Sequence, residues 1–180
     1  MSRRRHLQVV TSDGKDREDA CYHRTKQLPR VEALPLVPIE RLCLKVLRHI
    51  CESLACETAF GWETAHKLAQ RELGDTDGMT FVRSIAGLLY AIRAERQGEF
   101  SFMVADCPIC SRHLCEEEQT ILELLRAARL SDGSALTDLA CRLVGDGMVA
   151  CVVLAASVLG AELDALAGPI DRQGLSQVPG

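Results

Sequence analysis

The sequence predicts an all-α protein, an irregular bundle of about five to six helices with a short extended segment leading to a turn rich in cysteine and histidine. Aromatic residues make up only 4% of the 180 residues, and runs of β-branched residues are rare, so the composition favours helices packed on helices. A hydrophobic fraction of 47% is enough for one buried core in a chain of this length. We therefore expect a helical domain whose folding does not depend on its cysteines.

The apolar pattern predicts the first three helices in order. Apolar residues recur at three- and four-residue steps over residues 39–54, with Pro38 at the first helical position. A second, shorter helix is expected over residues 62–73 and ends at Gly74. Asp77 can cap a third helix, whose buried stripe runs over residues 81–92.

Three more helices are expected after an extended segment. Apolar and polar residues alternate over 99–104, which is typical of a strand. A fourth helix follows from residue 116, a fifth covers 137–144, and a sixth covers 148–167. The sixth helix is apolar nearly all round, so we expect it either at the centre of its own domain or in an interface with a second copy.

The expected domain plan has three parts. Residues 1–37 mix charges, glycine and prolines with little periodicity and are predicted to form a flexible N-terminal arm. Residues 38–168 form the helical domain, with the cysteine-rich knuckle at 106–116, and residues 169–180 form a loose C-terminal tail.

Charge and hydropathy restrict the expected partners and compartment. The net charge is −4, and residues 1–37 carry a surplus of three basic charges, so residues 38–180 carry −7; an acidic body disfavours nucleic-acid binding. The polar residues 11–16 follow the basic start, unlike a secretory signal, and we expect a cytoplasmic protein. The apolar stretch 148–161 is too short to span a bilayer, so no membrane partner is expected.

The segment Asp-Cys-Pro-Ile-Cys-Ser-Arg-His-Leu-Cys, residues 106–115, carries most of the chemistry of the chain. Two thiolates two residues apart on a tight turn can grip one metal ion, while backbone N–H groups stabilise the sulfur charge. The Cys-Pro-x-Cys pattern resembles the knuckle of many zinc-binding modules. We predict a metal site that includes Cys107, Cys110, His113 and Cys115.

The sequence offers alternatives for the third and fourth metal ligands. The side chains of His113 and Cys115, two residues apart, diverge in a helical or an extended backbone, so we expect one of them to join Cys107 and Cys110. The candidates for a fourth ligand are Cys56, His66, Cys21 and His23.

Zinc is the expected cofactor, and an iron–sulfur cluster is the alternative. Cys107, Cys110 and Cys115 offer three thiolates to a cluster, but their spacing matches neither standard ferredoxin run. The same Cys-Pro-Ile-Cys tetrad also resembles the active-site motif of glutaredoxins, which implies a thiol with a lowered pKa. The rest of the chain does not supply the further strands of a thioredoxin-like sheet.

The sequence favours a binding protein over an enzyme. Glu116, Glu117 and Glu118 are expected to interact with the N-terminus of the fourth helix rather than to act as general acids or bases. We find no phosphate-binding loop, nucleophile elbow or Ser/His/Asp series. We therefore expect an accessory, adaptor or regulatory protein that binds zinc and acts through contacts with another protein or with itself. The alternatives are an iron–sulfur or thiol-redox protein, such as a metallocofactor maturation factor, and a nucleic-acid-binding regulator.

Overall fold

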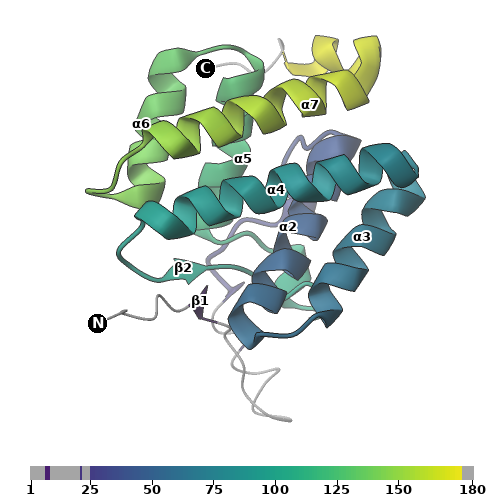
Figure 1. The fold of residues 1–180 in the computed structure, drawn as a ribbon. Helices are drawn as coiled ribbons and strands as arrows, with labels where there is room; N and C mark the ends of the chain where they lie inside the picture. The colour runs from purple at the N-terminus through teal and green to yellow at the C-terminus, as the bar shows by residue number, and fades with distance from the viewer. Residues whose placement is uncertain (1–6, 9–20, 22–24, 176–180) are drawn as a thin grey trace.

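The computed structural model describes residues 7–8, 21 and 25–175, and in this part of the chain it is an all-α bundle, as predicted (Figure 1). Two short strands, β1 and β2, pair in parallel, with Leu7 opposite Phe100 and Gln8 opposite Ser101. The helices and strands are β1 (Leu7–Gln8), the 3₁₀ helix η1 (Val31–Ala33), α2 (Pro38–Cys56), α3 (Phe60–Leu73), α4 (Asp75–Glu95), β2 (Phe100–Ser101), the 3₁₀ helix η2 (Cys110–Arg112), α5 (Glu116–Arg129), α6 (Gly133–Val144) and α7 (Ala150–Leu175).

The first three helices begin and end close to where local chemistry predicts. Pro38 begins α2, and the carboxylate of Glu40 accepts a hydrogen bond from the N–H of Val37 at 3.1 Å. Gly74 ends α3 with a φ of +84°, a backbone conformation that glycine adopts without steric cost. α4 begins at Asp75, one half-turn before the predicted cap at Asp77.

The last two helices are longer than the apolar pattern predicts. The side chain of Asp132 accepts a hydrogen bond from the N–H of Ala135 at 3.0 Å, and this cap starts α6 at Gly133 instead of at residue 137. α7 continues to Leu175, whereas Gly168 and Pro169 predict an end near residue 167. The pattern misses the extra turns because a proline is disfavoured inside a helix.

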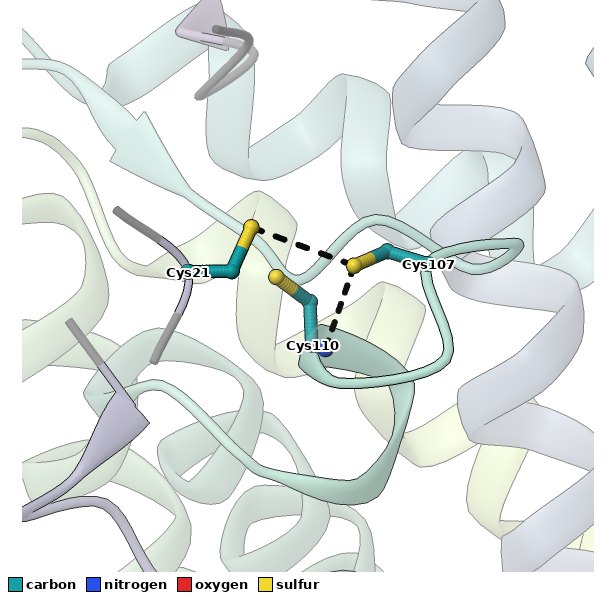
Figure 2. A group of neighbouring side chains, drawn as sticks. All are labelled: Cys21, Cys107 and Cys110. Atoms are coloured by element: carbon teal, nitrogen blue, oxygen red, sulfur yellow. Dashed lines mark hydrogen bonds between the residues drawn. The ribbon is translucent and has the colours of Figure 1, made fainter. Parts of the chain in front are cut away.

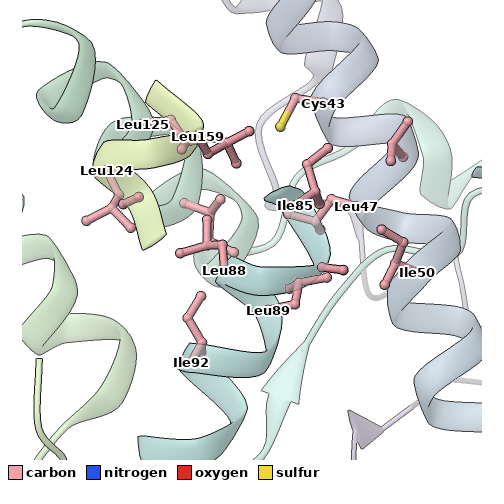
Figure 3. Close-up of a cluster of buried hydrophobic side chains, with 14 of the residues drawn as sticks. Cys43, Leu47, Ile50, Ile85, Leu88, Leu89, Ile92, Leu124, Leu125 and Leu159 are labelled. Carbon is pink, nitrogen blue, oxygen red and sulfur yellow. The ribbon is translucent and has the colours of Figure 1, made fainter. Parts of the chain in front are cut away.

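The core lies where α2, α4, α5 and α7 meet, and α3 packs against α2 and α4 (Figure 3). Each of the four helices contributes one apolar face at the three- and four-residue spacing seen in the sequence. The labelled core residues are Cys43, Leu47 and Ile50 from α2, Ile85, Leu88, Leu89 and Ile92 from α4, Leu124 and Leu125 from α5, and Leu159 from α7.

α7 lies on the surface beside α4, with one face buried and one exposed (Figure 1). Val152, Ala156 and Leu159 are fully buried, whereas Leu154 is 66% exposed and Val158 is 55% exposed. The segment Ala150–Ala167 has the length and mean hydropathy, 1.8, of a membrane-spanning helix, and 28% of it is buried. The expected absence of a membrane partner thus stays a prediction.

The chain before α2 packs against the loop that precedes α5. The N–H of Leu114 donates to the carbonyl oxygen of Pro29 at 3.0 Å, and Arg30 forms an antiparallel bridge with His113. Thr25, which is 2% exposed, donates its hydroxyl to the carbonyl oxygen of Cys21 at 2.9 Å. These contacts bring Cys21 to the knuckle from the N-terminal side.

Candidate metal centre

The knuckle at residues 106–116 is a tight turn followed by a single 3₁₀ turn. The carbonyl oxygen of Cys107 accepts from the N–H of Ser111 at 2.9 Å, which closes the chain around Pro108 and Ile109. The N–H of Cys110 points at the sulfur of Cys107, with a distance of 3.4 Å. Such N–H···S bonds stabilise a thiolate in metal knuckles, so the local geometry is that of a metal-binding turn.

Three cysteine sulfurs converge at this turn: those of Cys21, Cys107 and Cys110 (Figure 2). All three sulfur atoms lie within 4.8 Å of one another, and the Sγ atoms of Cys21 and Cys107 are 3.9 Å apart. A tetrahedral zinc ion with Zn–S bonds of about 2.3 Å places its sulfur ligands about 3.8 Å apart. The group can therefore bind a metal ion with little rearrangement.

The structure adds Cys21 to the two cysteines that the knuckle pattern identifies. Cys21 and Cys110 are each 6% exposed, and Cys107 is half-buried. Leu28 and Met103 pack around these thiols and shield them from solvent. A dry, apolar surrounding of this kind strengthens the interaction between thiolates and a cation.

His113 and Cys115 lie outside this group of three. The Nδ1 atom of His113 is 2.9 Å from the carbonyl oxygen of Ile109, so one ring nitrogen faces the backbone of the knuckle itself. The thiol of Cys115 donates to the carbonyl oxygen of Ser101 at 3.3 Å, and Cys115 is the N-cap residue of α5. The participation of either residue in metal binding stays a prediction.

Cys56 and His66, two of the other candidates for a fourth ligand, lie outside the three-cysteine group. Cys56 is exposed at the end of α2, and His66 lies half-buried on α3. His23 lies outside the described residues. Within the part of the chain that the structure describes, the group therefore consists of three sulfur donors.

Burial and hydrogen bonding shift the pKa in opposite directions at Cys107 and in the same direction at Cys110. Burial raises the pKa of Cys107, but the N–H groups of Cys110 and Ile109 and the neighbouring thiols outweigh it, and the pKa lies below its usual value. Burial raises the pKa of Cys110, and its hydrogen bonds to Cys21 and Cys107 raise it further. Of these two knuckle thiols, Cys107 is thus the one that more readily offers a thiolate.

The pKa of Cys115 is shifted in the opposite direction to that of Cys107. Burial raises its pKa well above the usual range, and the nearby carboxylate of Glu118 raises it further. A neutral thiol is the form that can donate to the carbonyl oxygen of Ser101. Its structural role at the start of α5 is therefore consistent with its electrostatics.

A buried ion pair between Arg48 and Glu118 stabilises the backbone of the knuckle. Arg48 of α2 donates to both carboxylate oxygens of Glu118, at 2.8 and 2.9 Å, and also to the carbonyl oxygens of Ser111 and His113, at 2.8 and 2.5 Å. Glu118 is fully buried and accepts as well from the N–H groups of Met103 and Cys115. These bonds fix the backbone on both sides of the cysteine turn.

The sequence pattern alone does not identify Arg48 or Glu118 as parts of this site. Glu118 is one of three consecutive glutamates at a helix start, where all three have the same expected interaction with the helix N-terminus. The capping-box spacing, three residues after the N-cap Cys115, distinguishes Glu118 from its two neighbours. Arg48 lies outside the apolar stripe of residues 39–54, so no pattern in the sequence singles it out.

The fold and this group together define a helical bundle with a three-cysteine cluster able to bind a metal ion. No protein-family model, no curated protein and no solved structure matches the chain.

Proposed function

We propose that the chain is a zinc-binding accessory or regulatory protein, in which one ion fastens the segment around Cys21 to the knuckle. The observation that carries this proposal is the convergence of three sulfurs from two parts of the chain, with 3.9 Å between the Sγ atoms of Cys21 and Cys107. Structural zinc sites are built mainly from thiolates and imidazoles, and one further donor beside these three sulfurs would close the site. Three thiolates also satisfy the preference of zinc for soft ligands.

A structural role is favoured over a catalytic one by the state of the nearby carboxylates. Glu118 is committed to Arg48 and two backbone N–H groups, and Glu117 pairs with Arg96 at 3.1 Å. A carboxylate held by such partners is a poor general base beside a metal-bound water. The proposed ion therefore organises the fold around it and leaves function to the surfaces that it holds in place.

The exposed face of α7 supports a role in protein contacts. Leu154 and Val158 of α7 are 66% and 55% exposed, Met148 just before the helix is 68% exposed, and residues 148–161 contain no charged side chain. An uncharged apolar face can meet its own copy without burying an unpaired charge, so we propose a second copy of this chain as its occupant.

The thiol-redox alternative has one specific observation in its favour. The thiols of Cys21 and Cys107 lie 3.9 Å apart, and the pKa of Cys107 is lowered by its hydrogen-bond donors despite the opposing effect of burial. Oxidation of the two thiols by a disulfide such as oxidised glutathione would form one S–S bond, release two glutathione thiols and expel any metal ion. A metal site and a redox pair are thus alternative uses of the same sulfurs.

Elemental analysis of the purified full-length chain tests the proposal. We expect one zinc ion at the three-cysteine group, lost on substitution of Cys21→Ser or Cys107→Ser and kept in Cys141→Ser, whose thiol is exposed on α6. Iron together with acid-labile sulfide would support the cluster alternative instead. A metal-free chain, with a Cys21–Cys107 disulfide after mild oxidation, would overturn the zinc proposal in favour of the redox one.

A further inference from the structure

A second group of side chains that can bind a metal ion lies where the chain enters the knuckle. It consists of His49 and Glu52 of α2 and Asp106, the residue immediately before Cys107. One ring nitrogen of His49 and one carboxylate oxygen from each acidic residue all lie within 4.8 Å of one another. None of these residues belongs to the three-cysteine group.

The helix and the knuckle together place these side chains. His49 and Glu52 are three residues apart on α2, so they share one face of the helix. One carboxylate oxygen of Glu52 accepts from the N–H of Ala105 at 2.6 Å, which ties the helix to the start of the knuckle. This bond orients Glu52 and brings the neighbouring Asp106 to the same point, as an outer-shell hydrogen bond does in known metal sites.

His49 provides an independent indication of a ligand. The residue is only 7% exposed, and its Nδ1 atom makes no hydrogen bond with any described residue. The second carboxylate oxygen of Glu52, Oε2, lies 3.5 Å from this Nδ1 atom, which is beyond normal hydrogen-bond length. A buried polar atom without a partner is costly, and a bound cation would remove that cost.

We propose that His49, Glu52 and Asp106 form a second divalent-cation site, distinct from the thiolate site. One imidazole and two carboxylates suit a divalent transition-metal ion such as Zn²⁺ or Mn²⁺. Three protein ligands leave at least one coordination position open, and the exposure of Asp106 places the site at the surface. An oxygen donor from solution, such as a carboxylate, a phosphate or a water molecule, would complete the coordination of the cation.

A simple ion pair between His49 and Glu52 is the competing explanation. Substitution of Asp106 distinguishes this ion pair from a metal site. An intrahelical pair would need no third residue, whereas a metal site loses a ligand when Asp106 is removed. Because Asp106 is exposed, its substitution does not disturb the core. His49→Gln is a second variant, in which the buried ring itself is replaced.

Zinc stoichiometry in a zinc-buffered solution tests the proposal through four forms of the full-length chain. We expect two zinc ions in the wild type and one in Cys107→Ser/Cys110→Ser. Asp106→Ala and His49→Gln should each retain the thiolate-bound ion and bind the second at least about tenfold more weakly, since even outer-shell substitutions cost that much. Cobalt substitution assigns the sites, because only the thiolate site gives a sulfur-to-cobalt charge-transfer band.

His66→Gln is the matched control, since it removes a half-buried histidine from α3 and should keep both ions. A wild-type chain with one ion, unaffected by Asp106→Ala and His49→Gln, would overturn the second site and leave the proposed function intact. One ion that survives loss of the knuckle cysteines but not loss of Asp106 would support the second site and contradict the thiolate proposal.

Discussion

Arg48 of α2 and Glu118 of α5, 70 positions apart in the sequence, form a buried ion pair closed by hydrogen bonds of 2.8 and 2.9 Å. Arg48 is 3% exposed and Glu118 is fully buried. The pair also binds the backbone before and after the cysteine turn, so the core and the candidate metal centre share one polar network.

Removing one partner of this pair should be strongly destabilising. Glu118→Gln keeps the shape of the side chain but leaves the Arg48 guanidinium buried without its counter-charge, which costs on the order of 3–5 kcal/mol of unfolding free energy. Urea denaturation followed by circular dichroism measures this cost. Arg71→Gln is the control, because Arg71 and Glu72 are exposed and such pairs contribute less than about 1 kcal/mol. Equal stability of the two variants would show that the buried pair does not brace the fold.

Metal removal should loosen the knuckle and leave the helical core intact. The buried sulfurs form a cluster with Met103 that is separate from the large core of α2, α4, α5 and α7. At a free zinc concentration one hundred times the Kd, the ion contributes about 2.7 kcal/mol. Hydrogen exchange after chelation should therefore accelerate at Cys110 and His113 and stay unchanged at Leu88. Uniform acceleration, α4 included, would mean that the entire fold depends on the ion.

Cys115 and Cys110 should respond differently to substitution. Cys115→Ala removes a helix cap and the bond to Ser101, for a loss of about 1 kcal/mol, and should leave metal binding unchanged. Cys110→Ala should abolish metal binding at the three-cysteine group. Metal content and unfolding curves should be measured for both variants, to compare their metal binding and their stability. Loss of the ion from Cys115→Ala would instead favour the ligand set Cys107, Cys110 and Cys115.

The α7 face predicts concentration-dependent self-association. Leu154→Glu places a charge at the centre of the exposed apolar face, and it should convert a dimer to a monomer in size-exclusion chromatography with light scattering. Phe60→Glu is the matched control, since Phe60 is 69% exposed at the start of α3 and lies outside that face. A wild-type monomer at micromolar concentration would refute the proposed occupant.

The helices were predictable because each buries one continuous apolar stripe. The stripes of residues 39–54 and 81–92 correspond to the buried faces of α2 and α4. The end of α7 was not predictable from the pattern, because Gly168 and Pro169 disfavour a helix that in fact continues. Local preference therefore determined most helices but not the last one.

The candidate site was predictable only in its local part. The spacing of Cys107 and Cys110 identifies a metal-binding turn, because both ligands belong to one bend. Cys21 lies 86 positions away from Cys107 in a segment without periodicity, so only tertiary contacts bring it there. His49 illustrates the same limit, because only the fold places it beside Asp106, which belongs to a distant part of the sequence.

The sulfur coordination of the bound ion is the most direct test of the account. X-ray absorption at the zinc edge of Asp106→Ala, which weakens the proposed second site, should give three sulfur neighbours at about 2.3 Å, and adding Cys21→Ser should remove the sulfur-bound zinc. Zinc bound by two sulfurs in Asp106→Ala, and retained with the same coordination when Cys21→Ser is added, would contradict the proposal that the fold brings Cys21 to the knuckle as a ligand.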